Sequence, residues 1–125
     1  LRYAELLKEK MEKYDVNVYM VNTGWVGASA KSGANRFSLP KTRDIVNSIL
    51  GGQIEESKFE IDPYFGFQIP KTLGDIDSNL LNPVRAWNNL NEYHATAKDL
   101  VRKFQENYKQ YDLGDVAVLN AGPMI

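Results

Sequence analysis

The order of apolar and polar residues predicts a helix followed by a strand at the start of the chain. Charged residues separate apolar side chains that recur every three or four positions: Tyr3, Leu6, Leu7, Met11 and Tyr14. This spacing predicts an amphipathic helix with one buried stripe. The compact apolar run at residues 18–21 contains two β-branched residues and a tyrosine, which predicts a buried strand. A helix followed by a strand is typical of the α/β class.

A loop without hydrophobic periodicity follows at residues 24–35. Its glycines and alanines allow the backbone to approach a partner closely, and Gly27 and Gly33 can take positive φ. The sequence alone leaves two interpretations open, a mobile surface loop and a loop that holds a ligand. A strand, a glycine-containing loop and a helix start often bind a nucleotide at a strand's carboxyl end.

A second helix is expected to begin near Pro40. Proline suits a first helical turn, with Ser38 or Leu39 as the cap, and the glycines at positions 51 and 52 should end the helix. Its apolar face is expected to contain Ile45, Val46, Ile49 and Leu50.

The second half of the chain predicts two short strands and a long helix. Aromatic and β-branched residues alternate on either side of Pro63, at residues 59–61 and 65–69. Asn89 and Glu92 have capping-box spacing at the start of an amphipathic helix. Its apolar positions are Tyr93, Ala97, Leu100, Val101, Phe104 and Tyr108. A short apolar run at 116–119 is expected to be helical and to hold the C-terminus against the core.

Composition restricts the possible functions. The 125 residues, 43% of them apolar, form one domain or part of one. The net charge of -1 gives no indication of a nucleic acid or a membrane surface as partner. The chain has no cysteine and one histidine, which excludes disulfides and Cys/His zinc sites. No apolar run approaches the roughly 20 residues that cross a bilayer, so we expect a soluble, cytoplasmic protein. Because residue 1 is leucine, we expect a fragment or a processed product.

Two further patterns invite functional interpretations that the residues do not support. The acidic run at positions 75–79 has the Asp-x-Asp-x-Asn spacing of a calcium loop. However, Leu80 and Ala86 stand where an EF-hand needs glycine and glutamate. A turn with exposed acids explains it better. His94 has no partner motif, so we interpret it as a surface or capping residue.

Arg36 is the strongest single candidate for a ligand-binding residue. A guanidinium can stack flat against an aromatic base while its edges stay in water, and the adjacent Phe37 could supply an apolar wall. The alternative is that Arg36 makes a structural salt bridge and Phe37 is simply part of the core.

These residues also form part of a larger pattern. The chain has Val-Asn-Thr-Gly-Trp at 21–25, where the loop begins. After the loop come Arg-Phe-Ser-Leu at 36–39 and Thr-Arg-Asp-Ile-Val-Asn-Ser-Ile-Leu at 42–50. Together with residues 59–63, 67–70, 81–83 and 121–123, this arrangement resembles the C-terminal part of ATP-dependent phosphoenolpyruvate carboxykinase. The joint pattern covers nearly the whole chain.

The resemblance implies a mixed α/β fold in which residues 1–125 are one partial domain, the C-terminal part of the nucleotide-binding domain. The implied order is helix, strand, loop and helix, then short strands and a long amphipathic helix. The implied reaction is gluconeogenic: oxaloacetate and ATP give phosphoenolpyruvate, ADP and carbon dioxide. Matched residue by residue, Arg36, Phe37 and Thr42 are expected to contact the adenosine part of ATP. Phenylalanine replaces the family's usual aliphatic residue, so the wall stays apolar but changes shape.

The resemblance also implies what this chain lacks. The family's phosphate loop, its Mg or Mn ligands and its oxaloacetate-binding arginine belong to an N-terminal portion. We therefore expect no catalytic residue and no metal site here, and no turnover by this chain alone. A rival hypothesis is a non-catalytic α/β protein-interaction module that grips a partner through residues 24–35.

Overall fold

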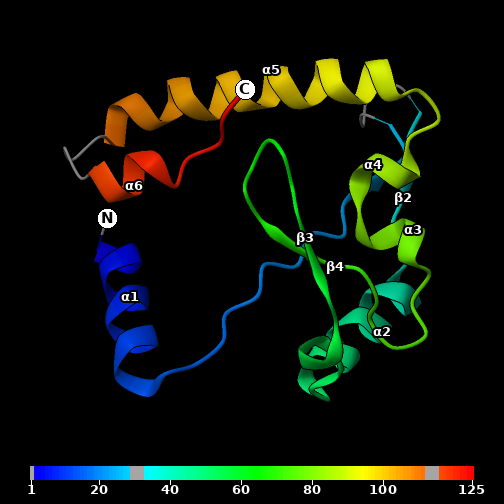
Figure 1. The fold of residues 1–125 in the computed structure, drawn as a ribbon, viewed down its shortest axis with the longest axis horizontal. Helices are drawn as coiled ribbons and strands as arrows, with labels where there is room; N and C mark the ends of the chain where they lie inside the picture. The colour runs from blue at the N-terminus through cyan, green and yellow to red at the C-terminus, as the bar shows by residue number, and fades with distance from the viewer. Residues whose placement is uncertain (1, 29–32, 112–115) are drawn as a thin grey trace.

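The computed structural model describes residues 2–28, 33–111 and 116–125, which are mostly helical with two small sheets (Figure 1). Within these ranges the elements run in this order: α1 (Arg2–Tyr14), β1 (Trp25–Val26), β2 (Asn35–Arg36), α2 (Leu39–Leu50), the 3-10 helix η2 (Gln53–Glu56), β3 (Phe59–Ile61), β4 (Gln68–Pro70), α3 (Ser78–Leu81), α4 (Pro83–Ala86), α5 (Leu90–Tyr108), the 3-10 helix η3 (Lys109–Tyr111) and α6 (Val116–Asn120). Each sheet is an antiparallel pair, β1 with β2 and β3 with β4. The predicted mixed α/β class is therefore correct. The expected order of the first elements, a helix, a strand, a loop and a helix, is not.

The predicted buried strand at residues 18–21 is wrong. These residues are extended, exposed and outside both sheets. Figure 1 shows them as part of a segment without regular secondary structure that leads away from α1. Helix α1 forms as expected, and Asp15 ends it with a positive φ of 48°. Its predicted buried stripe is also wrong, because no residue of α1 is buried. A strand and an apolar stripe are stable when they are packed against neighbours, and the described residues bury neither α1 nor residues 18–21.

Helix α2 begins and ends as its sequence predicts. The Ser38 side chain accepts a hydrogen bond from the Lys41 amide, and the helix stops at Gly51, with Gly52 following at a φ of 79°. Its inward side meets a small core of Ile45, Ile54 and Leu73, joined by the half-buried Phe37, Ile49, Ile76 and Leu81. The expected apolar face is only partly buried, because Val46 and Leu50 are exposed.

The hairpin of β3 and β4 confirms the predicted strand at residues 59–61, whereas the second strand is Gln68–Pro70 and not residues 65–69 as expected. Phe59 pairs with Pro70 and Ile61 with Gln68, so the connecting turn spans residues 62–67. The buried carboxylate of Asp62 holds this turn by accepting hydrogen bonds from the amides of Tyr64, at 2.9 Å, and Phe65, at 2.6 Å. Charge-assisted bonds of this kind compensate for the desolvation of a buried carboxylate.

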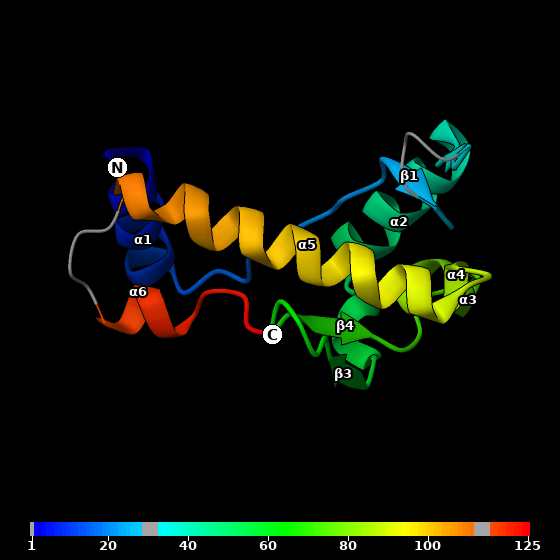
Figure 2. The same ribbon diagram turned by 90° about the horizontal axis from the view of Figure 1, so that it is seen from above.

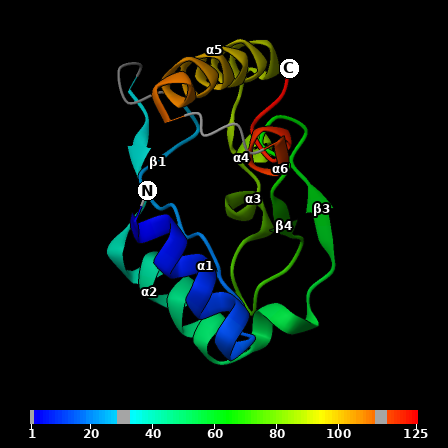
Figure 3. The same ribbon diagram turned by 90° about the vertical axis from the view of Figure 1, so that its left-hand side faces the viewer.

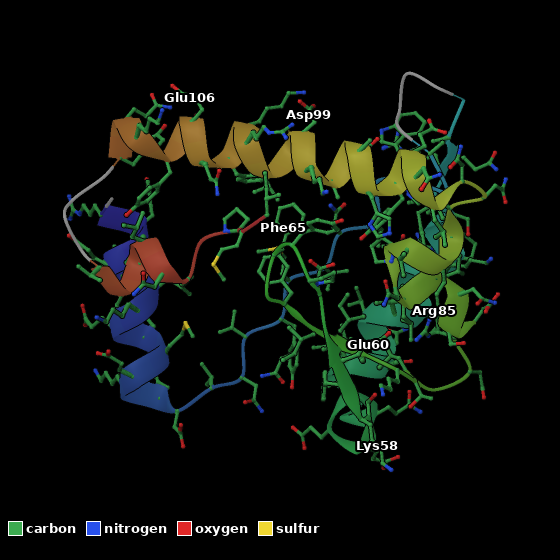
Figure 4. The ribbon with its side chains drawn as sticks, turned by 45° about the horizontal axis from the view of Figure 1, so that its top comes forward. Lys58, Glu60, Phe65, Arg85, Asp99 and Glu106 are labelled. Atoms are coloured by element: carbon green, nitrogen blue, oxygen red, sulfur yellow. The ribbon has the colours of Figure 1, made fainter. Side chains whose placement is uncertain are left out.

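Helix α5 lies across the top of the molecule and covers the hairpin tip (Figures 1 and 2). Asn89 caps its first turn by accepting hydrogen bonds from the amides of Asn91 and Glu92, as the capping-box spacing predicts. Its buried face consists of Tyr93, Ala97 and Val101. Phe65 points from the hairpin tip towards this helix and meets Phe104 edge-on (Figure 4).

An ion pair joins the hairpin to the short helices on the opposite side of the molecule from α1. Arg85 of α4 lies 2.7 Å from the Glu60 carboxylate of β3, which also accepts a hydrogen bond from Asn82 (Figure 4). Both charged side chains are about two-thirds buried, so the pair is screened less than a surface pair. This contact sets the position of α4, which matters for the site described next.

The C-terminus returns to the hairpin and α5, as the sequence predicts. Helix α6 forms over the expected apolar run, and the Met124 amide then donates to the Tyr64 carbonyl at 2.8 Å. The Gln105 side chain of α5 donates to the Pro123 carbonyl. None of the helices in the described ranges has the length and apolar character needed to span a membrane.

Candidate functional site

A cavity of about 560 Å³ lies between the β1–β2 ribbon, the start of α2 and the α3–α4 region. Its described lining residues are Val26, Gly27, Ala28, Gly33, Ala34, Asn35, Arg36, Phe37, Ser38, Lys41, Leu80, Ala86 and Asn88. Part of the predicted ligand loop, residues 29–32, lies outside the described residues. Two of the three predicted adenosine contacts, Arg36 and Phe37, line this cavity.

Arg36 is the last residue of β2, and it is exposed. It pairs with Trp25 of β1, and the next amide, that of Phe37, donates to the Gly24 carbonyl at 3.0 Å. Among residues 2–28, 33–111 and 116–125, Arg36 makes no salt bridge. The alternative of a structural salt bridge is therefore not seen in the described chain, and the guanidinium borders open space.

Phe37 lies between the cavity and the core. It lines the cavity, and it also packs against the core of Ile45, Ile54 and Leu73. The aromatic ring is therefore held from behind, which gives the cavity a fixed apolar wall.

Thr42 lies in the first turn of α2 and is absent from the described lining of the cavity. Its hydroxyl donates to the Ser38 carbonyl at 3.0 Å, a bond typical of threonine in a helix. Ser38 itself lines the cavity, so Thr42 is one residue removed from the open space.

Sequence reasoning missed the far wall of the cavity. Ala86 and Asn88 follow in the chain about fifty positions after Arg36, and Leu80 belongs to α3. Gly27 explains how the two walls meet, because a Cβ at this position would lie 2.9 Å from the Ala86 carbonyl oxygen. Gly27 and Gly33 both have positive φ, as their sequence context predicts. In the sequence, the glycine at position 27 indicated that another part of the chain approaches closely, but it did not indicate which part.

The charged residues in the described lining of the cavity are all basic. Arg36 and Lys41 are the charged residues that line it in the described chain, and no carboxylate accompanies them. An open cavity edged by two cations attracts anions. Lys41 was not predicted as a site residue.

A second cavity, of about 570 Å³, lies further along α2, beside its C-terminal half. Its lining contains Asp44 and Asp75 without a cation, together with Asn47, Ser48, Gly51, Gln53 and Ile76. In the described part of the chain, no group of three or more His, Cys, Asp or Glu side chains could hold a metal ion. Asp77, from the rejected calcium pattern, caps α3 by accepting from the Asn79 amide.

An aromatic cluster lies behind the far wall. Trp87 meets Tyr93 edge-on, and the Tyr64 hydroxyl is 2.7 Å from Nδ1 of His94. His94 is therefore half-buried and partnered, which corrects its interpretation as a surface or capping residue. Burial raises the pKa of Tyr93 above its ordinary value, and the nearby Asp62 carboxylate adds to this effect. The cluster packs side chains of the hairpin turn against the first turns of α5.

Residues 1–79, more than half of the chain, match the family described as phosphoenolpyruvate carboxykinase. The chain belongs to this family. The matched range contains Arg36, Phe37 and Thr42. The resemblance seen in the sequence motifs is thereby confirmed at the level of the family.

Individual members of the carboxykinase family are similar over almost the whole chain. A phosphoenolpyruvate carboxykinase (ATP) of Leptospira biflexa is 49% identical over 112 residues, which is 90% of this chain and 21% of the relative. One of Sulfurimonas denitrificans is 43% identical over 125 residues, 98% of this chain and 24% of the relative. One of Staphylococcus haemolyticus is 39% identical over 121 residues. The chain spans about a fifth to a quarter of the length of these relatives.

Proposed function

We propose that this chain forms the adenosine side of the ATP site of a phosphoenolpyruvate carboxykinase. The parent reaction would convert oxaloacetate and ATP into phosphoenolpyruvate, ADP and carbon dioxide. The observation that carries the proposal is the cavity beside Arg36, whose described charged lining is entirely basic. Relatives named for ATP make a nucleotide the natural anion for it.

Each proposed contact has a separate physical role. The Arg36 guanidinium stacks on the adenine face, where cation–π attraction is stronger than in open water. Phe37 supplies the apolar wall on which the ring or the ribose rests. Lys41 attracts the phosphates as a point charge. Thr42 is proposed as a contact at the edge of the nucleoside, next to Ser38.

The phosphate and metal half of such a site does not fit the residues described here. The chain lacks a Gly-x-x-x-x-Gly-Lys cradle, and the described carboxylates form no metal-binding group. ATP and its divalent metal, Mg or Mn, would therefore be held largely by another part of a carboxykinase. We expect this chain alone to show no oxaloacetate-dependent ATP consumption. Measured turnover would contradict this division.

The direct test is calorimetric titration of ATP and ADP against the chain and two variants. We expect weak, saturable binding, which Arg36→Ala weakens about tenfold because a desolvated cation–π contact contributes about 1–2 kcal/mol. Arg102→Ala is the matched control, since Arg102 is an exposed arginine on α5 that lines neither cavity.

Equal affinity of the Arg36→Ala and Arg102→Ala variants would refute the proposed stacking.

A further inference from the structure

The far wall of the cavity beside Arg36 belongs to a short element. Ala86 and Asn88 lie at the end of α4 and just after it, and α4 is only four residues long. A helix of this length gains little stability from its own hydrogen bonds, because fixing the first turn costs much conformational entropy. The position of the wall therefore depends on the contacts that α4 makes with other elements.

The β3–β4 hairpin holds α4 from one side. Arg85 lies 2.7 Å from Oε1 of Glu60, and the Asn82 side-chain amide donates to the same oxygen, also at 2.7 Å. Oδ1 of Asn82 caps α4 by accepting from the Val84 amide at 3.1 Å. Glu60 occupies the middle position of β3 and pairs with Ile69 of β4, which fixes its backbone. One carboxylate oxygen thus holds both the cap residue of α4 and a residue within the helix.

The opposite side of α4 meets the loop at Gly27. A Cβ at Gly27 would lie 2.9 Å from the Ala86 carbonyl oxygen, so the two backbones are nearly in contact. Figures 2 and 3 show α3 and α4 between the β1–β2 ribbon and the β3–β4 hairpin. The described lining of the cavity includes neither Glu60 nor Arg85, so any effect of this pair on the cavity passes through α4.

Burial distinguishes this pair from an ion pair on the surface of α5. The side chains of Arg85 and Glu60 are 35% and 27% exposed, whereas those of Lys103 and Asp99 are 70% and 57% exposed. An exposed pair contributes little, but a partly buried charge that loses its partner stays desolvated. Loss of Glu60 therefore favours an arrangement in which Arg85 reaches water, and α4 would move with it.

We propose that Glu60 and Arg85 are positioning residues for nucleotide binding. Their ion pair holds Ala86 and Asn88 in place as the far wall, so the cavity is formed before the ligand arrives. A wall that had to be ordered on binding would lower the affinity. This proposal rests on the proposed function, because it concerns the same cavity.

Adenosine titration followed by nuclear magnetic resonance of the ¹⁵N-labelled chain tests this role. Glu60→Met and Arg85→Met each remove the pair, and we expect each to weaken adenosine binding about fivefold. The double variant should lose no more than one single variant does, because a shared interaction can be lost only once. Asp99→Asn is the matched control: it removes the exposed pair with Lys103 and should change the affinity by less than about 1.5-fold.

The ligand-free spectra separate positioning from stability. Glu60→Met should move the amide resonances of Gly27 and Asn88, whereas Asp99→Asn should leave them in place. A role in stability alone would lower the urea concentration of unfolding but would leave these resonances and the affinity of the folded chain unchanged. That result would overturn the proposal.

A conservative substitution keeps the test decisive if Glu60→Met does not fold. Arg85→Lys retains a cation that can donate to Glu60, and it should recover most of the affinity that Arg85→Met loses. Equal affinities of these two variants would contradict the positioning role.

Failure of the proposed function would give a different result. If the unchanged chain showed no saturable adenosine binding, the nucleotide cavity would be refuted and the positioning role with it. Normal binding by the unchanged chain that Glu60→Met and Arg85→Met leave as it is would overturn the positioning role alone.

Discussion

The cavity beside Arg36 and the cavity beside Asp44 enclose about 560 Å³ and about 570 Å³, yet they offer opposite charge. Helix α2 borders both of them, the first at its N-terminal end and the second along its C-terminal half. Lys41 in its first turn lines the first cavity, and Asp44, one turn later, lines the second. Volume therefore does not identify a ligand site in this molecule. The sign of the charge does, because a nucleotide is an anion and two carboxylates would repel it.

The walls of the two cavities differ in rigidity as well. At Gly27, beside the first cavity, a Cβ would meet the backbone carbonyl of Ala86 at 2.9 Å. At Gly74, near the second, it would meet the end of the Gln53 side chain at 2.7 Å. A backbone wall keeps its position, whereas a flexible side chain can move. The first cavity is the better preorganised of the two.

The largest effect should come from the core that both cavities share. Phe37, in the wall of the first cavity, and Ile76, in the wall of the second, both pack on the cluster that contains Leu73. Leu73 is 2% exposed, so Leu73→Ala should lower the free energy of unfolding by about 3 kcal/mol. Urea unfolding followed by circular dichroism measures this change.

Leu50→Ala is the control for that experiment. Leu50 is 81% exposed at the end of α2, so its truncation should change the free energy of unfolding by less than about 0.5 kcal/mol. If both variants unfolded at the same urea concentration, the described core would not be the one that stabilises the cavities.

A smaller effect is expected from Gly27→Ala, which should alter the first cavity alone. The new methyl group combines a positive φ of 83° with the close Ala86 carbonyl, so we expect a loss of about 2 kcal/mol and weaker ATP binding. Gly33→Ala shares the positive φ but meets open space, so it should lose only about 1 kcal/mol. A reversed order of the two variants in urea unfolding would contradict the close contact between the two walls.

The smallest effect should come from single charges on α2. Lys41→Ala should weaken ATP binding about threefold at low salt, and less at high salt, because an exposed ion pair contributes under about 1 kcal/mol. Asp44→Asn, about one turn further along the helix beside the second cavity, should change ATP affinity by less than about twofold. Calorimetric titration at two salt concentrations distinguishes them. A stronger response to Asp44→Asn would exchange the roles of the two cavities.

The sequence predicted the parts of the fold whose partners are close along the chain. Ser38 and Asn89 cap helices through amides two or three residues away, and β3 pairs with β4 across a short turn. The prediction at residues 18–21 was wrong because a strand also needs a neighbour, and the described chain contains none for it. The same reason explains why α1 has no buried stripe.

In the candidate site, too, residues close together in the sequence could be predicted and residues far apart could not. Arg36 and Phe37 are adjacent in the sequence, and both line the first cavity. Ala86 and Asn88 could not be predicted, because a fold must first bring α4 against the glycine loop. Thr42 remains a predicted contact, with its hydroxyl directed to the Ser38 carbonyl.

Nuclear magnetic resonance of the ¹⁵N-labelled chain during an adenosine titration tests the central claim most directly. Adenosine carries no phosphate, so it reports the proposed nucleoside contacts without the missing half of the site. We predict saturable shifts that concentrate at Gly27, residues 35–37 and residues 86–88, with little change at Asp44 and Asp75. Shifts centred on the second cavity, or no saturable shift in the millimolar range, would contradict the assignment of the cavity beside Arg36.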